Sequence, residues 1–159
     1  MEKYKLFLRL AKALNAGLNI TPLLFGSLGL EQRLGMDLHA DDIDILVPEY
    51  YLHDGWQALT RLMEQLGYEL YDLHEHAFRS GELSVAFAGI ENLIPFAGIN
   101  IAQIPMMNDG DAAYLLLELP DYQKVYEASS KDGYRVYKKE KKDYEKLALI
   151  MEALNRQSG

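Results

Sequence analysis

The chain has 159 residues, no cysteine and a formal net charge of −8, from 16 basic and 24 acidic side chains. This length suits a single domain with a sizeable core, and the lack of cysteine excludes disulfides, a thiol nucleophile and a zinc–thiolate site. The acidic balance argues against general nucleic-acid binding but does not exclude nucleotide binding, because a bound cation can reverse the local field. No apolar run is long enough to cross a membrane, and the charged start lacks a signal peptide's apolar core, so we expect a cytoplasmic protein.

The first predicted elements are a helix over residues 3–16, ended by Gly17, and a short apolar strand over residues 21–25. The helix is predicted because four apolar side chains recur with the period of one helix face: Phe7, Leu10, Ala11 and Leu14.

Gly26-Ser27 follows the strand directly, and a short helix is expected over residues 28–34, closed by Gly35. Backbone N–H groups and a hydroxyl at the start of a helix can bind phosphate. Arg33 could face such a phosphate or be solvated, and the sequence leaves both open.

Asp42 and Asp44 alternate with isoleucines in a run that is typical of a strand. The two carboxylates then share one face, where they can hold one or two hard divalent cations. If the strand begins at Asp42, Asp41 points away from that face. A phosphate-binding turn followed by metal-binding carboxylates indicates a site for a metal-bound nucleotide.

Gly26-Ser27, a spacer, and an Asp-hydrophobic-Asp-hydrophobic strand together resemble the signature of the nucleotidyltransferase superfamily, whose fold is shared with DNA polymerase beta. Residues 28–35, with His39 shortly before the acids, are similar to the small antibiotic nucleotidyltransferases of the lincosamide type. These residues cover about one sixth of the chain, and it is their ordered combination that is specific.

The resemblance implies an α/β (α+β) fold, with a small mixed β-sheet packed with helices and a C-terminal helix. It implies metal-dependent transfer of a nucleoside monophosphate from an NTP, with ATP as the first candidate, to an unidentified acceptor with release of pyrophosphate. Asp42 and Asp44 would bind Mg²⁺ or Mn²⁺, Gly26 and Ser27 would bind the phosphates, and the position of His39 suggests a role in the site.

Three elements are predicted next: a helix over residues 54–66, an extended segment over residues 68–73 and a strand within residues 77–88. In the superfamily a third carboxylate commonly sits on the strand after the helix. Here the expected hydrophobic-Asp-hydrophobic triplet is missing.

Glu82 is the nearest acid to that position and is taken as the third catalytic carboxylate, with Glu91 as the next candidate. Asp72, Glu75 or no third acid at all are the remaining alternatives.

An extended segment over residues 99–106 and a strand over residues 114–119 flank a turn at residues 108–111, so a hairpin is expected. A short helix follows over residues 122–128. The final helix is predicted from four apolar residues on one face: Tyr144, Leu147, Met151 and Leu154.

Arg135, and Lys142-Asp143 at the start of the final helix, are similar to an Arg…Lys-Asp element near the C-terminus of many bacterial nucleotidyltransferases. Lys142 could belong to a basic wall that contacts phosphate, or it could be solvated.

The sequence therefore predicts one nucleotidyltransferase-like domain over residues 1–159, with a core over about 1–120 and a helical extension over about 121–159. The alternative is a catalytically silent domain of the same fold, acting by nucleotide or protein binding, for example in a toxin–antitoxin pair. A homodimer or a protein partner is compatible with either.

Overall fold

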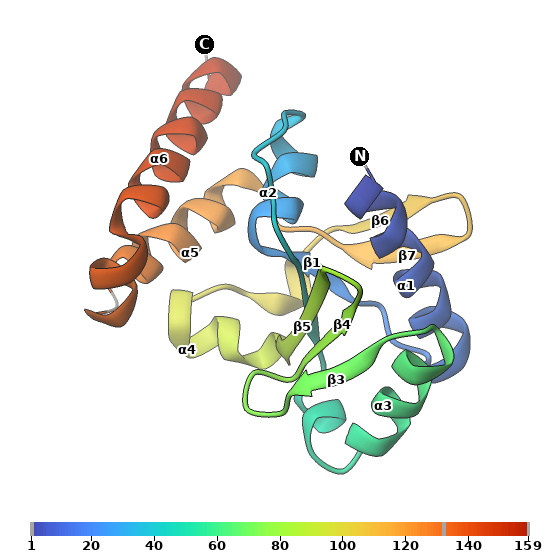
Figure 1. Cartoon of the computed structure of the whole chain (residues 1–159). Coiled ribbons are helices and arrows are strands. Elements are labelled where there is room, and N and C mark those ends of the chain that lie inside the picture. Colours follow the sequence, from blue (N-terminus) through green and yellow to red (C-terminus); the bar gives the residue numbers. More distant parts are fainter. Residues whose placement is uncertain (1, 132, 159) are drawn as a thin grey trace.

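The computed structural model describes the backbone of residues 2–131 and 133–158 and the side chains of residues 2–130 and 144–157. In this part of the chain, seven strands form one mixed sheet in the order β3-β4-β5-β2-β1-β7-β6 (Figure 1). The strands are β1 (Leu23–Phe25), β2 (Ile43–Val47), β3 (Glu69–Asp72), β4 (Ala77–Ser80), β5 (Leu83–Gly89), β6 (Met106–Asp109) and β7 (Ala112–Leu115).

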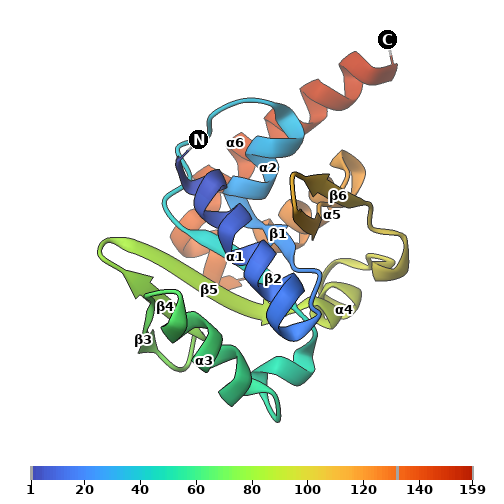
Figure 2. The same cartoon turned by 90° about the vertical axis from the view of Figure 1, so that its right-hand side faces the viewer.

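Helices cover both faces of the sheet, with α1 and α3 on one side and α5 and α6 on the other (Figures 1 and 2). The helices are α1 (Glu2–Leu18), α2 (Gly26–Leu34), α3 (Trp56–Gln65), α4 (Leu93–Ala97), α5 (Leu119–Lys131) and α6 (Gly133–Ser158), with short 3-10 turns η1 (Glu49–Leu52), η2 (Ile90–Asn92) and η3 (Ile101–Gln103). Within the described ranges, no helix is long and apolar enough to span a membrane.

β2 lies at the centre of the sheet, antiparallel to β1 and parallel to β5. Its side chains alternate as the sequence predicts: Ile43 and Ile45 are fully buried, whereas Asp44 is half-buried on the opposite face. Asp44 is aligned with Phe25 on β1 and with Ala86 on β5. The ladder on both sides therefore fixes the backbone that carries Asp44.

The expected small mixed sheet, packed with helices and followed by a C-terminal helix, is confirmed. The β6–β7 hairpin also forms where the turn signal predicts it. The strand predicted within residues 77–88 is β5, and the same range also holds the antiparallel β4, because the chain turns between Ser80 and Leu83. Two expectations are wrong. Most of residues 99–106 is not a strand, since η3 interrupts it, and the strand predicted over residues 114–119 ends at Leu115, before α5 begins at Leu119.

The final helix is confirmed, but its predicted apolar face is rotated from the one that packs. Ile150 and Ala153 are buried, while Tyr144 and Met151 are about half exposed. α6 packs mainly against α5, so the position of α5 decides which face of α6 is covered.

Candidate active site

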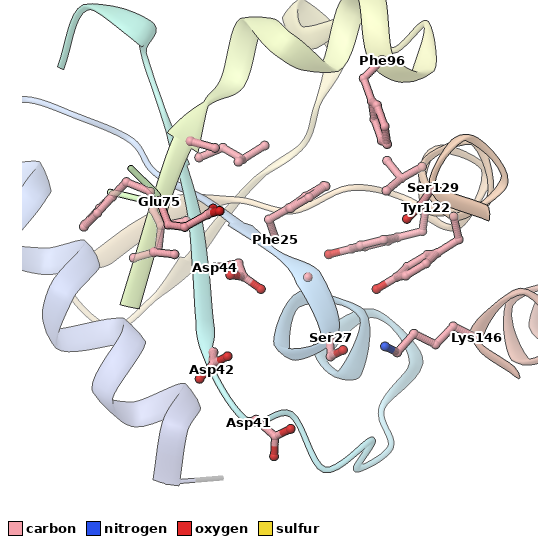
Figure 3. Close-up of a pocket in the computed structure, with 18 residues that line it drawn as sticks. Phe25, Ser27, Asp41, Asp42, Asp44, Glu75, Phe96, Tyr122, Ser129 and Lys146 are labelled. Atoms are coloured by element: carbon pink, nitrogen blue, oxygen red, sulfur yellow. The ribbon is translucent and has the colours of Figure 1, made fainter. Parts of the chain in front are cut away.

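A pocket of about 550 Å³ opens where β1, β2 and β5 meet α5 and α6. Its carboxylates come from the sheet side, whereas Tyr122, Ser129 and Lys146 come from the helices α5 and α6 (Figure 3). The lining residues are Phe25, Gly26, Ser27, Asp41, Asp42, Asp44, Ile45, Leu46, Glu75, Ala86, Phe87, Ala88, Phe96, Tyr122, Val125, Tyr126, Ser129 and Lys146.

The turn from β1 into α2 brings Gly26 and Ser27 to the pocket. Gly26 has a φ of +63°, and a Cβ at this position would collide with the Asp44 carboxylate. Glycine is therefore required both by the backbone and by the close approach of β2. Ser27 lies in the first turn of α2, where N–H groups lack partners within the helix and the helix dipole favours anions. Phe25 at the N-cap provides no side-chain hydrogen bond to this turn.

Asp42 and Asp44 line the same pocket, as the sequence pattern predicts. Asp42 lies just before β2 and Asp44 within it. Asp41 lines the pocket too, although strict alternation predicts that it points away. The strand begins one residue later than expected, at Ile43, so residues 41 and 42 lie outside the alternating ladder.

The donor set fits a hard divalent cation in part. Carboxylate oxygens are the ligands that Mg²⁺ accepts, and Mg²⁺ usually takes only one or two of them beside substrate phosphates and water. The described residues contain no group of three or more His, Cys, Asp or Glu arranged to hold a metal ion. Asp42 and Asp44 would supply two carboxylates to such a cation, and its remaining ligands would be water or substrate oxygens.

The structure does not bring Glu82 or Glu91 to the pocket. Glu82 lies in the turn between β4 and β5 and is exposed. Glu91 accepts a hydrogen bond from the Glu49 backbone N–H, at 2.9 Å. The acid that does line the pocket is Glu75, from the turn between β3 and β4, and its carboxylate is directed toward the side of Asp44 (Figure 3).

Arg33 and His39 also make contacts outside the pocket. Arg33 Nε and Nη2 donate to the backbone carbonyls of Leu117 (2.9 Å) and Leu116 (3.3 Å), which ties α2 to the start of α5. The His39 side chain is 90% exposed, with Nδ1 at 3.6 Å from Asp37 Oδ2. Its backbone has a φ of +57°, in the left-handed region.

The side chain of Lys142 lies outside the described residues. Four residues further along α6, Lys146 lines the pocket, with Nζ 5.6 Å from the centre of the Tyr126 ring. In Figure 3, Lys146 reaches toward Ser27 on one side of Asp44, and Glu75 lies on the other.

The sequence analysis did not predict the aromatic side chains that the helices contribute to the pocket. Tyr122 and Tyr126 come from α5, and Phe96 from α4. Tyr122 is fully buried, its hydroxyl donates to the Leu24 carbonyl (3.3 Å), and burial raises the pKa of that hydroxyl. The available signal was the helical spacing of Tyr122, Val125, Tyr126 and Ser129.

No model of a known protein family matches the chain. Its structure is similar to the crystal structure of ANT(2")-Ia in complex with adenylyl-2"-tobramycin, with a TM-score of 0.61 and 15% sequence identity over 99% of this chain and 92% of that one. The solution structure of the antibiotic-resistance factor ANT(2'')-Ia matches with a TM-score of 0.56 and 16% identity, over 97% of this chain and 86% of that one.

ANT(2")-Ia is an aminoglycoside nucleotidyltransferase. The chain therefore has the nucleotidyltransferase fold that is shared with DNA polymerase beta, which confirms the resemblance in the sequence. It is also 42% identical to the uncharacterized protein YnaI of Bacillus subtilis (strain 168) over 150 residues, 94% of this chain and 96% of the relative. The chain belongs to the family of YnaI.

Proposed function

We propose that the protein is a metal-dependent nucleotidyltransferase, which transfers a nucleoside monophosphate from an NTP to an acceptor and releases pyrophosphate. One observation carries the proposal: Gly26-Ser27 at the start of α2 and the carboxylates of Asp42 and Asp44 line one pocket in a nucleotidyltransferase fold. Phosphate-binding and cation-binding groups are thereby within reach of a single metal-bound nucleotide.

Ser27 and Lys146 are the proposed phosphate ligands. The first turn of α2 offers N–H groups and a hydroxyl, and Lys146 adds a positive charge from the opposite wall. Tyr126 lies beside Lys146 and Phe96 lines the same pocket, and both rings suit a nucleobase, whose flat face stacks on such rings. Ser27, Lys146 and these rings are the proposed site of the NTP.

Asp42 and Asp44 would hold Mg²⁺ or Mn²⁺ against the phosphates. A bound divalent ion neutralises the charge that develops on the transferred phosphoryl group. Through this ion, the two carboxylates would orient the reacting phosphate relative to Ser27.

Glu75 is the proposed base for the acceptor. The position on β5 that is aligned with Asp44 holds Ala86, so the sheet has no acid there. Glu75 lines the pocket on the side of Asp44 away from Lys146 (Figure 3). It is therefore suited to accept the proton of an acceptor hydroxyl as the new phosphate ester forms.

The hydroxyl acceptor stays unidentified, and a cytoplasmic location and a homodimer or protein partner stay predictions. A catalytically silent domain that binds nucleotide or protein is the second candidate. The methyl group of Ala86 beside Asp44 is the observation that favours it.

Calorimetric titration with ATP and the other NTPs, with and without Mg²⁺, tests the proposal on the wild type and on the Asp42→Asn/Asp44→Asn double variant. We expect magnesium-dependent binding that the double variant loses. Pyrophosphate release, screened over hydroxyl acceptors, then separates the enzyme from the silent domain. No binding of any NTP by the folded wild type would overturn the proposed nucleotide site.

A further inference from the structure

The segment between α2 and β2 delivers Asp41 and Asp42 to the pocket with almost no regular secondary structure. Residues 35–42 contain neither helix nor strand. Asp44 is fixed by the ladders to β1 and β5, but Asp42 precedes the first ladder pair of β2. The spacing between the two carboxylates therefore depends on what holds this segment.

Glu31, on α2, binds this segment through hydrogen bonds. Its Oε2 accepts hydrogen bonds from the backbone N–H groups of Leu38 (3.1 Å) and Ala40 (3.0 Å). Its own backbone carbonyl accepts from Gly35 (2.8 Å) and Met36 (3.3 Å) at the end of α2. A single residue thus receives four hydrogen bonds from the segment, the last of them two residues before Asp42.

The burial of Glu31 makes this arrangement unusual. Glu31 is 8% exposed, and among the residues whose side chains the structure describes it is the only charged one that is buried. A buried carboxylate is costly unless it is hydrogen-bonded, and N–H donors to a charged oxygen form strong bonds. Its partners here are two backbone N–H groups of the segment that leads into the site. These donors compensate the buried negative charge of Glu31.

The backbone at His39 gives independent support. His39 lies between the two bonded N–H groups and has a φ of +57°, a left-handed conformation that a residue with a Cβ adopts only when its surroundings impose it. The Asp37 side chain accepts from the His39 N–H at 2.7 Å. The segment is therefore held in one conformation by three hydrogen bonds on consecutive inner positions.

We propose that Glu31 is a positioning residue for the cation site: it holds the segment over residues 35–42 so that Asp42 faces the cation bound by Asp44. This inference rests on the proposed function, because it takes Asp42 and Asp44 as the cation ligands. It assigns to Glu31 a role that operates through the backbone, without contact to nucleotide or metal.

The test compares Mn²⁺ binding to the full chain, measured by electron paramagnetic resonance with Mn²⁺ alone, for the wild type, Glu31→Ala and Glu31→Gln. Removing a residue that orients a metal ligand without binding the metal typically weakens metal affinity about 10- to 100-fold. We expect a loss of Mn²⁺ affinity of that size for Glu31→Ala. Glu31→Gln should retain most of the affinity, because its amide oxygen can accept the same two bonds.

Asn15→Ala is the matched control. Asn15 also ties backbone segments together, through bonds to the carbonyls of Ile20 (2.8 Å) and Ala113 (3.1 Å) and from the Ala113 N–H (2.8 Å), but it does not line the pocket. We expect it to lower the melting temperature while Mn²⁺ affinity stays at the wild-type value. If Glu31→Ala does not fold, Glu31→Asp takes its place, since it keeps the charge and withdraws the oxygens by one methylene.

Three outcomes are distinct. A folded Glu31→Ala or Glu31→Asp variant with wild-type Mn²⁺ affinity would overturn the positioning role. So would Asn15→Ala if it weakened Mn²⁺ binding equally, since the effect would then be one of general stability. Mn²⁺ binding to the wild type that survives in Asp42→Asn/Asp44→Asn would instead refute the cation site, and with it the premise of the inference.

Discussion

Gly26 satisfies two constraints at one position, because it needs a positive φ and it leaves room for the Asp44 carboxylate. We predict that Gly26→Ala lowers the free energy of unfolding by about 1–2 kcal/mol from the left-handed backbone alone, and that it also displaces Asp44 and abolishes magnesium-dependent ATP binding. Urea unfolding and calorimetry measure the two effects.

Gly110→Ala provides the control for Gly26→Ala. Gly110 has a similar φ of +60° in the turn between β6 and β7, outside the pocket, and a Cβ there would meet nothing within 4 Å. We expect a comparable loss of stability with ATP binding retained. Loss of ATP binding in both variants would show that backbone strain, and not the contact with Asp44, is responsible.

Glu75 lines the pocket and Glu82 does not, so substitutions of these two acids form a test and its control. We predict that Glu75→Gln leaves magnesium-dependent ATP binding intact and slows pyrophosphate release by about 10²- to 10⁴-fold, the usual contribution of a general base. The rate is measured with an acceptor from the screen, or with water as the basal acceptor. Glu82→Gln, in an exposed turn, should leave both quantities unchanged; a slowed Glu82→Gln with a normal Glu75→Gln would reverse the assignment.

The difference between these two acids marks what the sequence could predict at the residue scale. Asp44 followed from local alternation, because it lies within the regular strand β2, whereas Asp42 lines the pocket from one residue before that strand. Glu82 is nearest in sequence to the expected third acid, but the β4–β5 turn carries it away from the pocket. Glu75 reaches the pocket through the turn between β3 and β4, and it is the pairing of β4 with β5 in the folded sheet that brings this turn there. No local period encodes such a contact.

At the scale of elements, the pocket depends on α6, which adds a positive charge opposite α2. We predict that Lys146→Met weakens ATP binding about 10- to 100-fold, as expected for the loss of a charge-assisted hydrogen bond to phosphate. Calorimetry at two salt concentrations checks this, since the difference between wild type and variant should shrink as salt rises.

Lys124→Met is the control for Lys146→Met. Lys124 lies on α5 and pairs with Asp121 at 3.9 Å, outside the pocket. The Lys124→Met substitution removes the same charge from the neighbouring helix and should leave ATP affinity unchanged. Equal weakening by both variants would indicate a general effect of net charge in place of a phosphate contact.

Helical periodicity predicted that the final helix exists but not which face it buries. Its apolar residues fit two overlapping faces, and the one containing Ile150 and Ala153 packs. The choice is made by α5, whose own start is fixed by the Arg33 bonds to the carbonyls of Leu116 and Leu117. The sequence shows that Arg33 lies close to Gly26-Ser27, which leaves a phosphate ligand or a solvated side chain open, but it does not show the distant carbonyls that Arg33 meets.

At the scale of the whole molecule, the fold places one fully buried tyrosine, Tyr122, between α5 and β1. Burial raises the pKa of Tyr122 above its ordinary value near 10.0, so the folded state holds this proton when the unfolded chain releases it. The resulting stabilisation is fully present below pH 10 and is lost as the pH rises above it, by up to about 1.4 kcal/mol per pH unit for one group.

We therefore predict that Tyr122→Phe is less stable than the wild type by about 1 kcal/mol at neutral pH, because the bond to the Leu24 carbonyl is lost, and that its stability falls less steeply above pH 10. The two urea-unfolding curves should approach each other as the pH rises. Tyr144→Phe, on the exposed face of α6, keeps the wild-type slope. Parallel curves for wild type and Tyr122→Phe above pH 10 would mean that Tyr122 ionises as readily in the folded protein as in the unfolded chain, and that α5 does not seal this side of the pocket from water.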